Sequence, residues 1–241
     1  MRSLRALLLS ALLVAVVGAT ALAALTEEFH PLFDGKSIDG WVRRGGEAEY
    51  HVENGEIVGV SKINTQNTFL CTPREYGDFI LEVELKVDSG LNSGIQIRSE
   101  CFDEAKKVTV EGTDGKPREI NIPAGRVHGY QVEIDPAPRA FSGGIYDEAR
   151  RGWLYEPCGA QHAKARAAFK LDDWNKYRIE CRGDSIKTWV NGVPVSDLHD
   201  SVTAKGFIAL QVHSVGGDEK MAGKEVRWRN LNIAELDADD N

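Results

Sequence analysis

Residues 125–136 have the sequence GRVHGYQVEIDP, and this stretch decides the fold because it predicts a strand with one polar face. Successive side chains of a strand point to opposite faces, so the apolar side chains here alternate with Gln131, Glu133 and Asp135. Two carboxylates and an amide on one face are unusual for a strand that is buried on both sides. We therefore predict that the polar face of this strand lines a cleft.

Two further segments show the same alternation of apolar and polar side chains. The polar positions are Asn92, Gln96 and Arg98 in residues 92–98 (NSGIQIR), and Gln211 and His213 in residues 207–213 (FIALQVH). Strands that carry such faces stabilise one another only if the polar faces share one surface. We predict that the three strands line the same cleft.

The remaining sequence predicts one all-β domain. Short apolar runs are separated by Gly, Asn-Gly and Asp-Gly, and 42% of the 241 residues are hydrophobic, which is enough for a core. Apolar and charged side chains alternate in residues 79–87, as in a sandwich strand with one solvent-exposed face. Asn54-Gly55 predicts a hairpin. Pro194 marks an edge strand, and residues 160–169 predict one short helix.

The first residues indicate an exported protein. Arg2 and Arg5 precede an apolar run, and residues 21–23 (ALA) fit an A-x-A cleavage site. We expect residues 1–23 to be a signal peptide and the mature protein to be periplasmic or extracellular, without a membrane span. An uncleaved anchor is the alternative, but the strongest apolar run is short for a membrane span.

We assign residues 24–235 to a single domain and residues 236–241 to a disordered acidic tail. Loss of Arg2 and Arg5 with the signal peptide changes the formal net charge from -8 to -10, which disfavours a nucleic-acid partner. Four cysteines in an exported chain allow three disulfide pairings. Their predicted positions favour Cys101 with Cys158, whereas Cys181 lies on the apolar phase of a strand and is equally well explained as a buried thiol.

A series of short motifs follows in a fixed order. They are LFDGK (32–36) with GW (40–41), YGDF (76–79), NSGI (92–95), GYQVEID (129–135), WN (174–175), WVNG (189–192) and RNL (229–231). Together they resemble the 3-keto-disaccharide hydrolase domain family over nearly all of the mature chain. The resemblance implies a concanavalin-like or laminin-G-like jelly-roll β-sandwich, with long loops over one concave face, in exported bacterial proteins that act on 3-keto sugars.

The resemblance also implies an elimination reaction. A ketone at C3 of a glycoside acidifies the hydrogen on C2, so a base can remove it and the enolate can expel the anomeric substituent. Such a site needs a base, a cation for the enolate oxygen and an acid for the leaving oxygen. We predict Glu133 or Asp135 as the base, His213 as the acid and Arg98 as the cation.

Other residues are predicted to hold the sugar or a metal ion. The predicted sugar ligands are Asn92, Gln96, Gln131 and Gln211 on the polar faces, with Tyr146 and Trp153 stacking from the long connection over residues 142–169. A divalent metal is an alternative to Arg98, and its predicted ligands are His128, Glu133, Asp135 and His213. No H-x-x-x-H motif supports that metal site.

Simpler interpretations stay open at this point. The acids could be solvated surface groups, Arg98 could pair with an acid across the sheet, and His213 could be structural. A carbohydrate-binding module without turnover is the leading alternative function. A retaining β-glucanase ranks third. Such enzymes carry the motif E-x-D-x-E on one strand, whereas this chain has Ala137 in place of the second Glu. The sequence defines neither the sugar nor the oligomeric state. It also leaves open whether the protein cleaves a 3-keto-glycoside by elimination, hydrolyses it directly or hydrates a glycal product.

Overall fold

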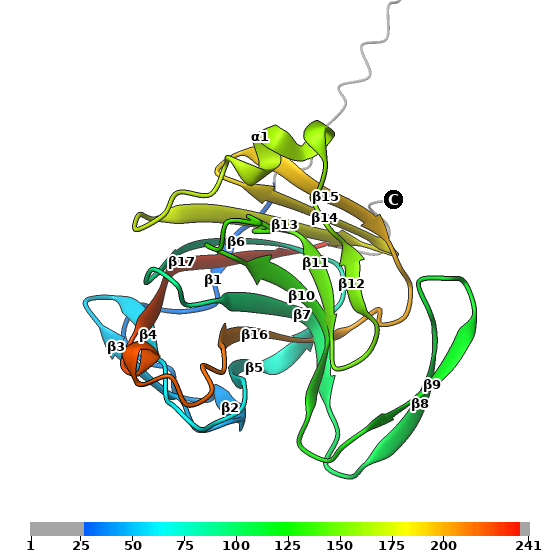
Figure 1. The fold of residues 1–241 in the computed structure, drawn as a ribbon, viewed down its shortest axis with the longest axis horizontal. Coiled ribbons are helices and arrows are strands. Elements are labelled where there is room, and N and C mark those ends of the chain that lie inside the picture. The colour runs from blue at the N-terminus through cyan, green and yellow to red at the C-terminus, as the bar shows by residue number, and fades with distance from the viewer. Residues whose placement is uncertain (1–26, 237–241) are drawn as a thin grey trace, which may run out of the picture.

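The computed structural model describes residues 27–236 as two antiparallel sheets stacked face to face (Figure 1). In spatial order, the first sheet contains β15 (Val193–His199), β14 (Ser185–Val190), β13 (Asn175–Arg182), β6 (Phe79–Val87), β17 (Glu225–Glu235), β4 (Glu56–Val60) and β3 (Glu49–Glu53), with β1 (His30–Pro31) paired to β17. The second sheet contains β12 (Gly152–Tyr155), β11 (Ile145–Glu148), β10 (Val127–Ile134), β7 (Ser93–Cys101), β16 (Gly206–Val212), β5 (Thr68–Tyr76) and β2 (Val42–Gly45). This architecture confirms the predicted all-β sandwich.

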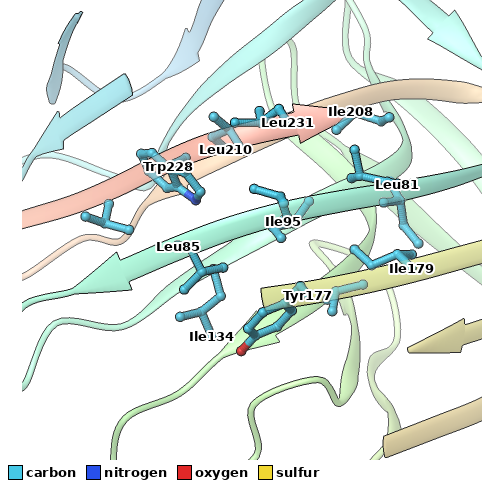
Figure 2. Close-up of a cluster of buried hydrophobic side chains, with 14 of the residues drawn as sticks. Leu81, Leu85, Ile95, Ile134, Tyr177, Ile179, Ile208, Leu210, Trp228 and Leu231 are labelled. Atoms are coloured by element: carbon cyan, nitrogen blue, oxygen red, sulfur yellow. The ribbon is translucent and has the colours of Figure 1, made fainter. Parts of the chain in front are cut away.

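The facing sides of the two sheets form one hydrophobic core. Figure 2 shows side chains of both sheets meeting there, with Leu81 and Ile179 from the first sheet and Ile95 and Ile134 from the second. On β6 the buried positions from Phe79 to Val87 alternate with half-buried charged residues, as the sequence predicts. The core therefore contains the side chains on one face of each sheet. The opposite face of the second sheet points away from the core.

The predicted turns are also found. Asn54 and Gly55 connect β3 to β4 with φ angles of 52° and 80°, and asparagine and glycine are the residues that tolerate positive φ at both positions of a tight hairpin. Pro194 lies in β15, which is an edge strand of the first sheet. Edge strands accept proline because one side of the strand needs no hydrogen-bond donor.

Two connections carry small elements of their own. The hairpin of β8 (Lys106–Glu111) and β9 (Pro117–Ile122) projects from the sandwich in Figure 1. The predicted helix is found as η1 (Ala160–His162) followed by α1 (Ala163–Arg166), and η2 (Glu219–Met221) is one further turn.

The cysteines differ from the favoured pairing, because Cys101 and Cys158 are both free. Cys101 is the last residue of β7 and packs against a small apolar cluster with Cys71, whereas Cys158 is exposed. Cys181 is a buried thiol of the core, and burial raises its pKa to about 12.

The strand β7 contains a bulge that the sequence does not reveal. Tyr130 pairs with Ile97 but His128 pairs with Glu100, so β7 has one residue more than β10 between these pairs. Arg98 lies in this interval with a φ of 44°. A bulge interrupts the alternation of side chains, so the face of β7 on which Gln96 lies does not continue to Arg98.

Some predictions fall outside the described residues. These are the signal peptide, residues 1–23, and the tail beyond residue 236. Within residues 27–236, no helix is long and apolar enough to cross a membrane.

Candidate functional site

A polar cleft lies on the face of the second sheet that points away from the core. Its volume is about 550 Å³. The lining residues are Asn67, Asn92, Arg126, Gln131, Glu133, Asp135, Ala137, Arg139, Tyr146, Glu148, Trp153, Gln211 and His213. The strands β10 and β16 therefore bring their polar phases to one surface, together with Asn92 just before β7.

Glu133 is a buried acid of this cleft, with 4% of its surface exposed. Asn92 Nδ2 donates to Glu133 Oε1 over 2.8 Å, and Gln131 Nε2 donates to Oε2 over 2.9 Å. The guanidinium of Arg139 lies 3.4 Å from Oε1. Each carboxylate oxygen is thus held in place, which fixes the direction in which Glu133 faces the cleft.

An amide network behind Glu133 fixes Gln131 in turn. Gln131 Oε1 accepts hydrogen bonds from Gln96 Nε2 over 2.7 Å and from Gln211 Nε2 over 2.8 Å. Ser99 Oγ donates to Gln96 Oε1, but Gln211 Oε1 is buried without a partner among the described residues. Because an ionised carboxylate can only accept, Glu133 sets the orientation of the whole chain of amides.

Burial raises the pKa of Glu133 above its ordinary value of 4.5. The hydrogen bonds from Asn92 and Gln131 and the charge of Arg139 oppose this rise, whereas the charge of Asp135 adds to it. A carboxylate with a raised pKa binds a proton more strongly than a free one and is a better general base near neutral pH.

Asp135, the other predicted base, has its oxygens committed to a turn. Arg139 Nε donates to Oδ2 over 2.5 Å, and the backbone N–H groups of Ala137 and Phe141 also donate to this carboxylate. Asp135 therefore holds residues 135–141 and positions Arg139 beside Glu133. Glu133 is the better placed of the two predicted bases.

Arg126, Glu148 and His213 also line the cleft. Arg126 is ion-paired with Glu148, whose pKa is raised by burial. His213 Nδ1 lies 2.7 Å from the Ser214 carbonyl oxygen, which assigns the hydrogen to Nδ1 and leaves Nε2 as an acceptor in the neutral ring.

Four further residues line the cleft that were not predicted from the sequence: Asn67, Arg126, Arg139 and Glu148. Glu148 could have been predicted, because it lies two positions after Tyr146 on the same strand and hence on the same face. The two arginines lie outside the central strands, so alternation gives no information about them.

Tyr146 and Trp153 form an aromatic wall from the neighbouring strands β11 and β12. Their rings meet edge to face with centroids 5.3 Å apart, and the Arg139 guanidinium lies 5.3 Å from the Trp153 ring. Both side chains are half-buried, so part of each ring faces the cleft.

Arg98 does not reach the cleft, and its predicted role is corrected. Its side chain is fully buried and donates to the carbonyl oxygens of Gly77 and Gly183 and to Asp78 Oδ1, at 2.7 to 2.8 Å. The bulge in β7 directs it toward the first sheet. Gln96 is also removed from the cleft surface, because it lies fully buried and contacts the site only through Gln131.

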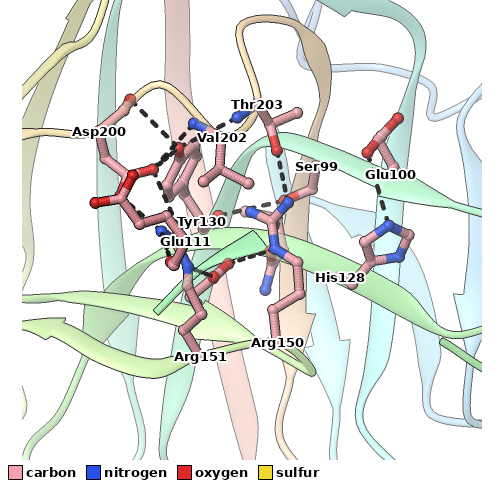
Figure 3. A network of polar contacts seen from close by, with 12 residues as sticks. Ser99, Glu100, Glu111, His128, Tyr130, Arg150, Arg151, Asp200, Val202 and Thr203 are labelled. Carbon is pink, nitrogen blue, oxygen red and sulfur yellow. Dashed lines mark hydrogen bonds and ion pairs between the residues drawn. The ribbon is translucent and has the colours of Figure 1, made fainter. Parts of the chain in front are cut away.

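The predicted metal site is not assembled either. His128 is buried against Phe102, and its Nε2 lies 3.7 Å from Glu100. A dashed line in Figure 3 marks the pair of His128 and Glu100. No three or more His, Cys, Asp or Glu side chains in residues 27–236 are grouped to hold a metal ion. The four predicted ligands therefore do not fit a metal, and no step below uses one.

An ionic network behind β11 fixes the strand that carries Tyr146 and Glu148. Asp147, on the opposite phase, accepts from Arg150 over 2.7 Å and from Arg151 over 2.5 Å. Arg151 also binds Asp200, which accepts a hydrogen bond from the Tyr130 hydroxyl (Figure 3). These groups are buried or nearly so, and a paired buried network of this kind holds a strand in one position.

A family model described as the 3-keto-alpha-glucoside-1,2-lyase-like domain matches residues 28–234. The chain belongs to this family. The match confirms the resemblance drawn from the sequence motifs. A search of curated proteins gives no match.

Solved structures share the fold of this lyase-like domain. A candidate glycosyl hydrolase from Parabacteroides distasonis ATCC 8503 is 21% identical with a TM-score of 0.51, over 87% of this chain and 100% of that one. A Bacillus subtilis protein of unknown function with a galectin-like fold is 12% identical with a TM-score of 0.56, over 86% and 94%. The kappa-carrageenase of Pseudoalteromonas carrageenovora is 11% identical with a TM-score of 0.51, over 89% and 97%.

Membership of the lyase-like family indicates a carbohydrate-related function. The cleft of this domain combines a buried carboxylate of raised pKa, an arginine and a histidine with an aromatic wall. Such a set can bind a sugar ring and remove a proton from a carbon next to a carbonyl group.

Proposed function

We propose that this protein cleaves 3-keto-glycosides by elimination, with Glu133 as the general base. The observation that carries the proposal is the environment of Glu133, which is buried in a polar cleft, oriented by three donors and raised in pKa. A general base needs a fixed position and benefits from a raised pKa, and the contacts and burial of Glu133 favour both.

The reaction proceeds in two steps. Glu133 takes the hydrogen from C2 as a proton, and the electron pair of that C–H bond forms the C2–C3 double bond of an enolate. The enolate then re-forms the ketone and expels the C1 oxygen, which leaves a C1–C2 double bond. Protonated Glu133 returns the proton to the departing oxygen, so the products are an unsaturated keto sugar and an alcohol.

Other cleft residues supply binding and charge. We place the C3 oxygen at Arg126, because a cation is needed where negative charge develops and Glu148 holds this guanidinium in position. His213 Nε2 is an acceptor for a sugar hydroxyl group. Gln211 is fully buried and holds Gln131 in place. Tyr146 and Trp153 offer ring faces for stacking on the sugar.

The test is release of nitrophenol from a nitrophenyl 3-keto-glucoside, set against the parent glucoside, with purified protein from residue 24 onward. We expect turnover of the keto compound alone. Glu133→Gln keeps the shape of the side chain but not the base, and should lower kcat by about 100- to 10,000-fold.

The matched control is Glu75→Gln, which removes an exposed carboxylate of β5 outside the cleft and should leave turnover unchanged. Equal rates for the two variants would remove Glu133 from the mechanism. Binding of both sugars without any turnover would instead favour a carbohydrate-binding module, which the aromatic wall and the amides of the cleft also suit.

A further inference from the structure

A second, apolar groove borders the polar cleft. Its volume is about 250 Å³. The residues that line it are Asp135, Pro136, Ala137, Pro138, Ala140, Arg166, Phe169 and Leu171. Asp135 and Ala137 line both hollows, so the exposed segment around Ala137 is the rim between them.

The chemistry of the groove differs from that of the cleft. Prolines, alanines, Phe169 and Leu171 supply most of its lining, with two charged residues, Arg166 and Asp135. The Asp135 carboxylate already accepts hydrogen bonds from Arg139 and from the backbone of the turn. Leu171 is 61% exposed, the largest value among the large hydrophobic residues that the structure describes. A lone exposed leucine is ordinary on a protein surface, but one that lines a groove beside a candidate active site marks a binding surface.

The position of the groove relates it to the leaving group. C1 is bonded to C2, so the departing oxygen must lie next to the carbon that Glu133 deprotonates. Glu133 and Asp135 are two residues apart at the end of β10, and the rim at Ala137 follows directly. A leaving group on C1 that points away from Arg126 therefore passes over Ala137 into the apolar groove.

We propose that the groove binds an apolar leaving group, so that the preferred substrates are 3-keto-glycosides of alkyl or aryl alcohols. The inference rests on the proposed function, because that function places C1 near Glu133. The groove is small and apolar, which suits a hydrocarbon chain or a ring and offers few partners for the hydroxyl groups of a second sugar.

A polar hollow at the other end of the cleft defines the competing outcome. It shares Arg126 with the cleft, has a volume of about 650 Å³ and is lined by residues such as Glu47, Asn64, Thr65 and Gln66. Arg126 and Asp135 flank β10 at its two ends, so the two hollows lie in opposite directions from the sugar. A leaving group placed in the polar hollow would be a sugar.

The experiment compares octyl with methyl 3-keto-glucoside, because both leaving groups are simple alcohols of similar acidity and differ in apolar length. We expect kcat/KM to favour the octyl compound by about 10-fold, given the apolar area that the groove can cover. Leu171→Ser should reduce this preference by about 3- to 5-fold. Val42→Ser is the matched control, since Val42 is the other exposed large hydrophobic residue described and lies on β2, and it should keep the preference.

A second readout needs no turnover. Calorimetry measures binding of octyl glucoside, below its micelle concentration, and of methyl glucoside to the protein and to both variants. Tighter binding of the octyl compound that is lost in Leu171→Ser but kept in Val42→Ser supports the groove even if no keto sugar is cleaved. Equal binding and equal turnover of the two compounds, or a preference for a 3-keto-disaccharide that Leu171→Ser does not alter, overturns the groove and leaves the elimination proposal intact.

Discussion

Glu133 must be ionised to act as a base, so its raised pKa determines the pH below which activity decreases. Burial places the native pKa above 4.5, so protonation begins at a higher pH than for a free glutamate. We expect kcat/KM to be constant above that raised pKa and to decline as the pH drops through it. A pH–rate profile of the 3-keto-glucoside reaction measures this decline, the acidic limb of the profile.

Substitution of Arg139 tests whether the acidic limb of the pH–rate profile reports the ionisation of Glu133. Its charge lowers the pKa of Glu133, so Arg139→Met should move the limb to higher pH. A limb that stays in place would mean that another group controls the rate. The side chain of Arg139 is 47% exposed, so solvent screens its charge and the shift should be modest.

Arg98 stabilises the fold, although its position in the sequence suggested a catalytic role. Arg98→Met would remove three buried hydrogen bonds and leave Asp78 without its cation. We expect the free energy of unfolding to fall by about 3 kcal/mol, measured by urea denaturation, with turnover per folded molecule within about twofold of the parent. A stable variant that has lost its turnover would place Arg98 back in the reaction.

Single residues show how far sequence reasoning reaches. Gln131 and Glu133 were predictable because a strand repeats every two residues and polar side chains on a buried strand are conspicuous. Arg126 and Arg139 were not, since they come from the ends of β10 and from a turn, where no period exists. The role of Arg98 was mistaken for a related reason, because a bulge leaves no mark in composition.

At the scale of elements, the close packing of Gln131 of β10 against β7 depends on Gly94. A Cβ atom at this position would lie 2.4 Å from Cδ of Gln131, too close for any real contact. Gly94→Ala should therefore displace Gln131 and, with it, the donor to Glu133 Oε2. We expect a loss of about 10-fold or more in kcat/KM and a decrease of about 1–3 kcal/mol in the free energy of unfolding.

Gly77→Ala is a suitable control for that prediction. Its added Cβ would meet the Ala204 carbonyl oxygen at 3.7 Å, which is an ordinary contact, and Gly77 lies outside the cleft. Turnover and thermal unfolding of the two variants are compared side by side. Equal behaviour would mean that Gln131 adjusts without consequence for Glu133.

At the scale of the whole molecule, the sequence predicted the sandwich well because its turns are chemically explicit. Asn54-Gly55 and the alternation in residues 79–87 each allow one local structure, and both are found. The shape of the cleft was not predictable in the same way. It depends on the turn held by Asp135 and on the network around Asp147, where Arg151 links Asp147 to Asp200, 49 residues further along the chain.

The strand order has a consequence for the synthesis of the protein. β16 lies between β7 and β5, and β17 lies between β6 and β4, so residues 206–235 complete the middle of both sheets. A ribosome delivers these strands after all the others, and until then β4, β5, β6 and β7 present unpaired backbone edges. The growing chain cannot close either sheet, and its apolar strands stay open to mispairing with other chains. We therefore expect the chain to be most prone to aggregation before residues 206–235 are in place.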